Sequence, residues 1–405
     1  MPEAVIVATA RSPIGRAFKG SLSTIRPDDL LAQVVTAALA KVPELDPAQV
    51  EDLIVGCGLP GGEQGFNIAR VTSILLGLDN VPGTTVNRYC SSSLQSTRMA
   101  YHAIKAGEGD VFISGGVECV SRFVKGSSDS LPDTRNPQFG DAQARTEATA
   151  AAETPWHDPR ADGNVPDVYI AMGQTAENLA ALRGITRADQ DEFGVRSQNL
   201  AEKALANGFW QRDITPVTLP DGTVVSADDG PRAGTTLEKV ASLKPVFREH
   251  GTVTAGNCCP LNDGAAAVIV MSDVKAASLG LTPLARIVST GVSALSPEIM
   301  GLGPVEASRK ALSRSGMAIS DVDLVEINEA FAAQVIPSYR DLGIDLATLN
   351  VNGGAIAVGH PFGMTGARIT STLLNSLQFH DKTIGLETMC VGGGQGMAML
   401  FERLS

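Results

Sequence analysis

The chain repeats one order of elements in its first and last thirds, and this repetition restricts the folds open to it. Residues 37–56, AALAKVPELDPAQVEDLIVG, resemble residues 310–328, KALSRSGMAISDVDLVEIN. Residues 109–118, GDVFISGGVE, resemble residues 384–395, IGLETMCVGGGQ. The repeated units are long, so we predict two similar βαβ-rich halves rather than a solenoid of short repeats. Chance similarity between two α/β units is the alternative.

Both regions alternate between strand-like and helix-like segments. Short apolar runs predict strands, and apolar residues at helical spacing, such as Leu31, Val34 and Val35, predict helices. This alternation is typical of α/β proteins with buried strands. We predict strands at 4–8, 52–55, 83–87, 110–114, 323–327 and 383–388, and helices at 28–41, 67–76, 91–106, 304–315, 329–342 and 366–377.

The pattern changes between the two regions, at about residues 121–252. Residues 126–166 are rich in Ser, Asp, Thr, Ala and Pro with little periodicity, whereas 171–182 and 187–207 have helical spacing. We predict a long insertion that lies over one face of the first half and carries binding surfaces. A strand within residues 254–271 then returns the chain to the core.

The charge balance narrows the class of protein. The formal net charge is −12, which argues against a nucleic-acid-binding protein and against attachment to an anionic membrane, although a local basic patch could hold a small anion. The sequence contains no run of about 18 apolar residues, the length of a transmembrane helix. Its start has no basic segment before the apolar run, so we expect a first strand there rather than a signal peptide.

The cysteines lack the spacing of a metal site. Six cysteines and five histidines occur without a CxxC pair or a zinc-ligand spacing, so we expect no metal. Thiols without a disulfide framework are typical of a reducing compartment, and we therefore expect a cytoplasmic protein.

Two of the cysteines and one histidine stand in suggestive local sequences. Cys90 lies between a predicted strand and a predicted helix in NRYCSSSL, so its thiolate would face the positive end of that helix. His360 lies in the glycine-rich turn NGGAIAVGHP and could take the thiol proton and hold an ion pair. Cys390 precedes Gly392 in CVGGGQG, whose backbone N–H groups could form an oxyanion hole. Together these residues suit acyl transfer through a thioester, although each alone is consistent with ordinary packing.

Asn328 ends the predicted strand DLVEI. One interpretation makes it the N-cap of the following helix. The other makes its amide a group that orients a catalytic water, and the residues alone leave both open.

Seven blocks, taken in order, resemble the thiolases, the family of acetyl-CoA acetyltransferases and 3-ketoacyl-CoA thiolases. They cover essentially the full chain: NRYCSSSLQS, GGVECVSR, MGQTAENLA, GTVTAGNCCPLNDGAAAV, EINEAFAAQ, NVNGGAIAVGHPFGMTGAR and CVGGGQGMAM. The resemblance implies an α/β thiolase fold, in which two duplicated βαβ-rich halves form a layered αβαβα core with an inserted loop domain. We place the N-terminal half at residues 1–272, its loop domain at about 121–252, and the C-terminal half at 273–405.

The resemblance also implies a two-step acyl exchange. Cys90 would carry the acyl group, and His360 would deprotonate Cys90 or the incoming CoA thiol. Cys390 would exchange a proton with the α-carbon of the acetyl-CoA unit. Asn328 and His360 would form one oxyanion site through a water, and the backbone N–H groups of Cys90 and Gly392 would form the other. In one direction CoA cleaves a 3-ketoacyl-CoA, and in the other two acyl-CoA molecules condense, for example to acetoacetyl-CoA.

CoA and acyl-CoA are the implied substrates, with no permanently bound cofactor. The expected CoA contacts are Arg232 near the nucleotide and Met172, Ala255, Cys259, Ala330 and Phe331 near the pantetheine.

Three departures from the family pattern are expected to lie in the substrate tunnel. Ser92-Ser93 stand where the family usually has Gly or Ala, and Cys258-Cys259 where many members have Ser. Ala171 stands where biosynthetic members have His, which favours the degradative type. The departures leave the preferred acyl chain, the direction in the cell and the pathway open.

Two other functions compete with a thiolase. A condensing enzyme of the ketoacyl-synthase type would need two histidines near its nucleophile, where this chain offers Asn328 and Cys390. A non-catalytic acyl-CoA or lipid binder of the same fold would not need all four catalytic side chains. Family members are usually dimers or tetramers, so we expect a homodimer or homotetramer.

Overall fold

One continuous ten-stranded sheet folds into two layers, each called a sheet below, which enclose a pair of central helices. The structure is a computed structural model that describes residues 2–125 and 134–405. The strands of the main sheet are β1 Ala4–Arg11, β2 Gly15–Arg16, β3 Asp52–Gly56, β4 Gly83–Val86, β5 Val111–Cys119, β8 Asn262–Ser272, β9 Ala285–Ala294, β10 Leu324–Ile327, β11 Ile384–Val391 and β12 Gln395–Arg403. A separate hairpin pairs β6 Val217–Thr218 with β7 Val224–Val225.

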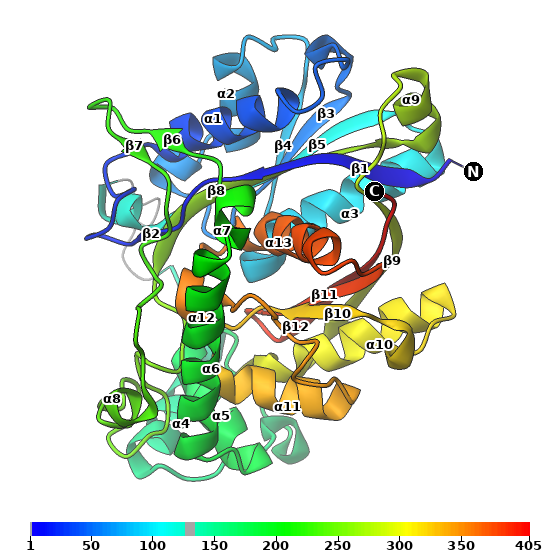
Figure 1. The fold of residues 1–405 in the computed structure, drawn as a ribbon. Helices are drawn as coiled ribbons and strands as arrows, with labels where there is room; N and C mark the ends of the chain where they lie inside the picture. The colour runs from blue at the N-terminus through cyan, green and yellow to red at the C-terminus, as the bar shows by residue number, and fades with distance from the viewer. Residues whose placement is uncertain (1, 126–133) are drawn as a thin grey trace.

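The helices form three further layers. They are α1 Pro27–Leu39, α2 Ile68–Leu75, α3 Ser92–Ala106, α4 Gly140–Ala152, α5 Met172–Arg183, α6 Arg187–Ala206, α7 Phe209–Asp213, α8 Leu237–Ala241, α9 Asp273–Ser278, α10 Gly303–Ser315, α11 Ala332–Leu342, α12 Ala355–Val358 and α13 Thr365–Phe379. In Figure 1, α1 and α2 cover the upper sheet, α3 and α13 lie between the sheets, and α10 and α11 lie below. This is the αβαβα layering that the family resemblance implies.

The two halves repeat the same strand order. Parallel β3 and β5 are followed by antiparallel β8 and β1, and parallel β10 and β11 are followed by antiparallel β12 and β9. The segments that resemble one another in sequence, β3 with β10 and β5 with β11, occupy equivalent places. The duplication is therefore confirmed. The halves join where β1 pairs with β9 at Val5–Arg286 and Ile6–Ala285.

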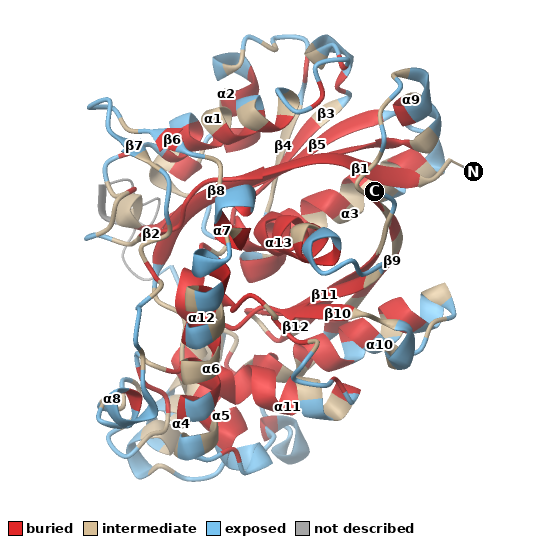
Figure 2. Ribbon diagram, viewed as in Figure 1, coloured by how far each residue is buried: buried red, intermediate tan, exposed pale blue. Residues whose placement is uncertain are grey.

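The central position of α13 explains its composition. Twelve of its 15 residues are buried, because a sheet lies on each side of the helix (Figure 2). Its buried hydroxyls all have protein partners: Thr370 donates to Glu387, while Ser371 and Thr372 donate to Asp213. Buried polar groups of this kind must be hydrogen-bonded, which fixes the rotation of α13 about its axis.

The helices α5 and α6 of the insertion between β5 and β8 pack on the second half of the chain. Helix α5 contacts α11 and the 3₁₀ segment η7 (Pro297–Leu302), and α6 contacts α11 and α12. Ala176 and Ala180 of α5 share an apolar cluster with Ile327 and Val335. The prediction that the insertion covers the first half is therefore wrong for α5 and α6, whose partners lie far along the sequence. It holds for β6, because Val217 packs in the apolar cluster of the first half.

Several elements differ from the sequence prediction. Helix α4 lies in the segment expected to lack periodicity, of which 126–133 falls outside the described residues. Only Ala142 of α4 is buried, so propensity rather than an apolar face indicates this helix. Strands β9 and β12 were not predicted. Helix α11 begins at Ala332 rather than at 329, because Cys258 pairs with Phe331 and keeps that residue extended.

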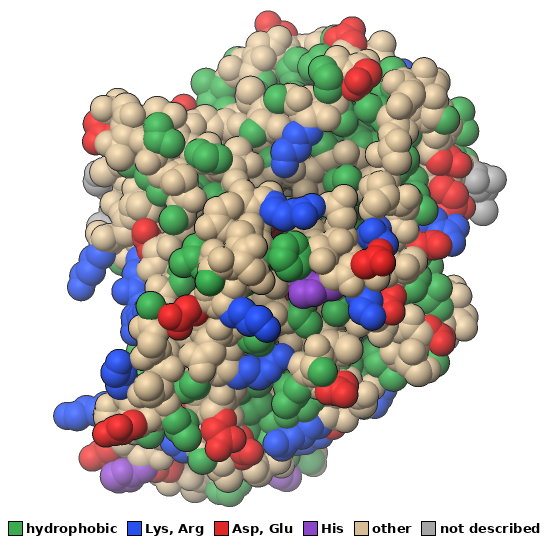
Figure 3. All heavy atoms as spheres, in the orientation of Figure 1, with side chains coloured by type: hydrophobic (Ala, Val, Ile, Leu, Met, Phe, Trp, Pro, Cys, Tyr) green, Lys and Arg blue, Asp and Glu red, His purple; other side chains and the backbone are tan. Residues whose placement is uncertain are grey.

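The surface carries charges of both signs. On the face drawn in Figure 3, acidic and basic side chains are interspersed, and several Lys and Arg side chains line the edge between β2 and α8. In the described ranges, the helices are all too short or too polar to cross a bilayer.

Candidate active site

The two central helices begin side by side, and their first turns touch. The N–H of Ala367 in α13 donates to Oγ of Ser93 in α3 across 2.8 Å. Gly366 permits this approach, because a Cβ there would lie 2.2 Å from a backbone nitrogen of α3. The residues that precede the two helices, Cys90 and His360 among them, therefore meet at one end of the middle layer, where both helix dipoles are positive.

Ser92 and Ser93 belong to this contact. Both side chains are fully buried, and the Ser92 hydroxyl donates to the carbonyl of Tyr89 at 2.7 Å. The prediction that this departure from the family lines the substrate tunnel is wrong. The Ser93 hydroxyl instead accepts from α13, and the Ser92 hydroxyl bonds to the backbone directly before its own helix.

Cys90 is a nearly buried thiol with two backbone donors near it. It lies in η3 (Tyr89–Ser91), directly before α3. Burial raises the pKa of Cys90 to about 11, and the charge of Glu118 adds to this. The N–H groups of Gly392 and of Cys90 itself favour the thiolate but only partly offset burial. The resting side chain is therefore a neutral thiol, and it needs a base to become a nucleophile.

His360 is a neutral imidazole whose proton is on Nδ1. Thr365 Oγ1 lies 2.6 Å from Nδ1 and donates its own hydrogen to the carbonyl of Pro361, also at 2.6 Å. The hydroxyl can therefore only accept from His360, so the lone pair is on Nε2, and this is the ring nitrogen that can act as a base. Burial, with a smaller effect of Arg368, lowers the pKa of His360 to about 3. The thiol and imidazole thus rest uncharged, and not as the ion pair allowed by the sequence.

Asn328 connects this imidazole to the strand that carries Cys390. Its Nδ2 lies 3.3 Å from Nε2 of His360, and its backbone N–H donates to the carbonyl of Thr388 in β11 at 3.0 Å. The N-cap of α11 is Phe331, so the N-cap interpretation of Asn328 is wrong. Oδ1 of Asn328 is buried and has no hydrogen-bond partner among the described residues.

Cys390 completes the cluster from the end of β11. Its side chain is fully buried, and burial together with the nearby Cys90 raises its pKa. Cys90 and Cys390 both also affect the pKa of Cys259, so the three thiols lie close together. The structure therefore brings Cys90, Cys390, Asn328 and His360 into one site. The backbone N–H of Gly392 donates to the Cys90 sulfur there.

Two cavities adjoin this cluster. The first, of about 250 Å³, is lined by Gly58, Leu59, Tyr89, Cys90, Val168, Tyr169, Ile170, Met172, Phe362, Gly392 and Gly393. The second, of about 500 Å³, is lined by Arg16, Ala17, Phe18, Lys19, Gln198, Gly230, Arg232, Val246, Phe247, Ala255, Cys258, Cys259, Pro260, Leu261 and Ile356. Of the residues expected to contact CoA, Met172 thus lines the first cavity, and Arg232, Ala255 and Cys259 line the second.

Ala330 and Phe331 support the second cavity from behind. The carbonyl of Ala330 accepts from the N–H of Cys259 at 3.0 Å, and the Phe331 ring packs edge-on against Phe247 at 6.2 Å between centroids. A Cβ at Gly173, next to Met172, would lie 2.3 Å from the Phe247 ring. Glycine at this position therefore lets α5 pack closely against Phe247, which lines the second cavity.

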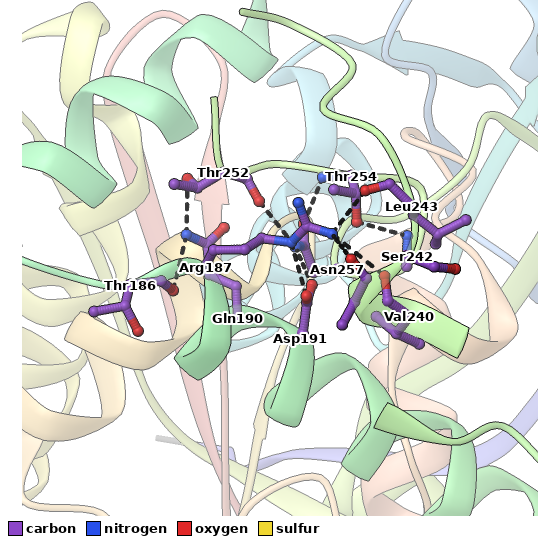
Figure 4. Close-up of polar contacts among 12 residues, drawn as sticks. Thr186, Arg187, Gln190, Asp191, Val240, Ser242, Leu243, Thr252, Thr254 and Asn257 are labelled. Carbon is purple, nitrogen blue, oxygen red and sulfur yellow. Dashed lines mark hydrogen bonds and ion pairs between the residues drawn. The ribbon is translucent and has the colours of Figure 1, made fainter. Parts of the chain in front are cut away.

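A polar network in the insertion holds the loop of the second cavity (Figure 4). Arg187 donates to Asp191 Oδ2 at 2.7 Å and to the carbonyls of Val240, Ala241 and Leu243. Asp191 Oδ1 accepts from Nδ2 of Asn257 at 2.9 Å, and Asn257 Oδ1 accepts from the N–H of Thr254 at 2.8 Å. The network connects α6, α8 and residues 252–257, so the position of Cys259 depends on the insertion.

Several residues that shape the site were not predicted from the sequence. Glu118 accepts from the N–H groups of Gly58 and Gly363, each at 2.8 Å, and so joins the turns beside Cys90 and His360. Asn262 accepts from the backbone N–H of His360 at 2.9 Å, and Thr365 determines which ring nitrogen of His360 carries the proton. All three lie within the quoted blocks GGVECVSR, NCCPLNDGAAAV and HPFGMTGAR. Each is a polar residue within a block that resembles the family, and this feature could have identified them from the sequence.

Comparison with known proteins agrees with this geometry. The chain matches the family models for "Thiolase, N-terminal domain" over residues 4–274 and for "Thiolase, C-terminal domain" over residues 281–403. The chain belongs to the thiolase family. It is 43% identical to the 3-ketoacyl-CoA thiolase of Bacillus subtilis strain 168 over 99% of this chain and 100% of that protein. It is also 43% identical to the 3-oxoadipyl-CoA/3-oxo-5,6-dehydrosuberyl-CoA thiolase of Escherichia coli K12, with 100% of both chains covered.

Solved structures give the same result for the fold. The dimeric peroxisomal thiolase of Saccharomyces cerevisiae superposes on this thiolase with a TM-score of 0.88 at 35% identity, covering 99% of this chain and 97% of that one. The acetyl-CoA acetyltransferase of Bacillus anthracis superposes with a TM-score of 0.86 at 38% identity, covering 100% and 99%. The predicted thiolase fold is confirmed, and this thiolase is an enzyme of the acyltransferase class.

Proposed function

We propose that this thiolase cleaves a 3-ketoacyl-CoA with CoA, giving acetyl-CoA and a shortened acyl-CoA, through an acyl thioester on Cys90. The main support is the place of Cys90, whose thiol lies at two backbone N–H donors in the same site as a neutral imidazole. The reverse reaction, condensation of two acyl-CoA molecules, uses the same groups.

CoA would extend from the second cavity to the thiols. Arg16, Lys19 and Arg232 supply positive charge for its phosphates. Ala255 and Cys259 would face the pantetheine, with the Phe331–Phe247 pair behind them. CoA and acyl-CoA are then substrates, and in this proposal the reaction uses no resident cofactor.

The first half-reaction begins with transfer of the Cys90 proton to Nε2 of His360. The thiolate attacks the 3-keto carbon, and the N–H groups of Cys90 and Gly392 stabilise the oxyanion. The bond between C2 and C3 then breaks and leaves the acyl group on Cys90. The enolate of acetyl-CoA takes a proton from Cys390, and its oxygen is held by a water between Asn328 and His360. The unpaired Oδ1 of Asn328 supports such a water.

The second half-reaction restores both thiols. The incoming CoA thiol gives its proton to the Cys390 thiolate and attacks the acyl carbon. Cys90 leaves as a thiolate and recovers its proton from His360. Since the pKa of Cys90 is raised and that of His360 lowered, the first proton transfer is unfavourable until the oxyanion sites stabilise negative charge on the substrate.

Further expectations belong to the same proposal. Assembly as a homodimer or homotetramer is supported by the description of the yeast relative as dimeric. A cytoplasmic location is supported by six cysteines that are all free. A role in fatty acid β-oxidation is supported by the 3-ketoacyl-CoA name of the B. subtilis relative, whereas the E. coli name indicates other 3-oxoacyl thioesters. Pairing of β8 with β1 and β5 supports the division into halves at residues 272 and 273.

Mass spectrometry of the intact protein tests the proposal. Incubation with acetoacetyl-CoA should give an acetyl adduct on the peptide that contains Cys90, and added CoA should remove it. Binding without an adduct would favour the acyl-CoA carrier instead. Condensation without thiolysis would favour an enzyme of the ketoacyl-synthase type.

A further inference from the structure

The cavity beside Cys90 has an apolar lining. Leu59, Val168, Ile170, Met172 and Phe362 form much of its wall, together with glycines and two tyrosines. Its described lining includes neither Lys, Arg nor His. Any ionised group that entered this cavity would therefore lose water without gaining an opposite charge.

The buried charge directly behind this wall is acidic. Glu118 is fully buried, and its two oxygens accept from the side chain of Gln64 and from the N–H groups of Gly58, Leu59 and Gly363. Burial raises the pKa of Glu118, while the four donors at its oxygens lower it and favour the ionised carboxylate. Glu118 also raises the pKa of Cys90, so its field reaches the nucleophile.

The cations lie at the other cavity. Arg16, Lys19 and Arg232 line the cavity assigned to CoA and do not line the cavity beside Cys90. They would be occupied by the phosphates of CoA. The two ends of the ligand thus meet opposite environments, one basic and one apolar with a carboxylate behind it.

The size of the apolar cavity limits the chain that it takes. Its volume is about 250 Å³, half that of the cavity assigned to CoA. That space suits a short to medium acyl chain.

We propose that this thiolase takes 3-ketoacyl-CoA substrates with an uncharged, apolar acyl chain and rejects chains that end in a carboxylate. The inference rests on the proposed function and narrows its substrate class. It distinguishes the chain from relatives named for 3-oxoadipyl-CoA, to which it is as similar as to those named for 3-ketoacyl-CoA. The physical reason is the cost of placing an ion in an apolar cavity next to a buried carboxylate.

Three thioesters of similar length test this inference: 3-oxohexanoyl-CoA, 3-oxoadipyl-CoA and the monomethyl ester of 3-oxoadipyl-CoA. We expect the hexanoyl compound and the ester to have kcat/KM values within about tenfold of each other. The free acid should be lower than the ester by at least about 100-fold. A free acid that equals or exceeds its ester would overturn the inference while leaving the proposed function intact.

Acetoacetyl-CoA is the control for the reaction itself. Inactivity on this compound and on all three others would overturn the proposed function, and the inference with it. Activity on acetoacetyl-CoA together with the expected order of the other three would support both.

A variant pair tests the location of the acyl chain. Leu59 lies at the mouth of the cavity, with 43% of its surface exposed, so a longer side chain can be placed there. Leu59→Arg should raise the ratio of kcat/KM for the free acid to that for its ester by at least about tenfold, because it adds a cation. The neutral variant Leu59→Met should leave this ratio unchanged. An unchanged ratio in Leu59→Arg, with the ester still turned over, would contradict this cavity as the acyl site.

Discussion

Replacing Thr365 with valine removes the hydroxyl that keeps the proton of His360 on Nδ1. Valine has nearly the same shape but leaves two buried groups unpaired, the Nδ1–H of His360 and the carbonyl of Pro361. Each unsatisfied buried group costs about 1–3 kcal/mol. The free energy of unfolding should therefore fall by roughly 2–6 kcal/mol, a large part of the 5–15 kcal/mol typical of a domain.

The same change should also reduce catalysis through the tautomer. Without Thr365 as acceptor, the proton can move to Nε2, where Oδ1 of Asn328 becomes its acceptor after the amide flips. Loss of about 1–3 kcal/mol in favour of the productive tautomer lowers the ratio of this tautomer to the other roughly 5- to 150-fold at room temperature. The population of the productive tautomer, and with it the rate of acylation of Cys90, should fall by up to this factor.

Two measurements separate stability from catalysis. Urea unfolding gives the change in stability, and single-turnover acylation with acetoacetyl-CoA, at a temperature where the variant is folded, gives the rate. Thr365→Ser retains the hydroxyl and should keep most of the activity, whereas nitrogen NMR of the imidazole should show the Nε2-protonated form only in Thr365→Val. Equal acylation rates in folded Thr365→Val and Thr365→Ser would refute the role of Thr365 in setting the tautomer.

Four further predictions follow from the site. Cys90→Ala should abolish turnover and give no acyl adduct by mass spectrometry; normal turnover would refute the mechanism. Cys390→Ser should retain more of the native rate of Cys90 acylation than of the native rate of acetyl-CoA condensation. Equal loss of both rates would argue against the role of Cys390 in proton exchange. Asn257→Ala should raise the KM for CoA more than it lowers kcat, since the loop that carries Cys259 loses its link to Asp191; an unchanged KM would contradict this. The pKa of His360 is about 3 in the folded protein, so the unfolded chain takes up this proton at a higher pH. The free energy of unfolding should therefore fall as the pH drops below about 6.5, by up to about 1.4 kcal/mol per pH unit. Urea unfolding at several pH values measures this fall, and the same slope against pH in the native enzyme and in His360→Gln would exclude the contribution.

Local pattern predicted the elements whose residues carry their own signal. Buried strands such as β5 and helices such as α10 stand out because apolar spacing reflects the period of the element itself. Helix α4 was missed because it has almost no apolar face, and its assignment depends on Ala-rich propensity. The side on which helix α5 of the insertion packs was also missed, because the partners of Ala176 and Ala180 come from residues 327–336 and no local pattern specifies them.

The sequence alone specified the duplicated α/β architecture and the reacting groups Cys90, His360 and Cys390, since chemistry of this kind depends on residue type and order. Their resting state depends on the fold. Burial between two sheets keeps the thiol and the imidazole neutral, Thr365 selects the ring nitrogen that carries the proton, and Glu118 sets the sign of the field near the acyl cavity. Protonation and polarity depend on the surroundings of a group, and here those surroundings are assembled from segments up to three hundred residues apart.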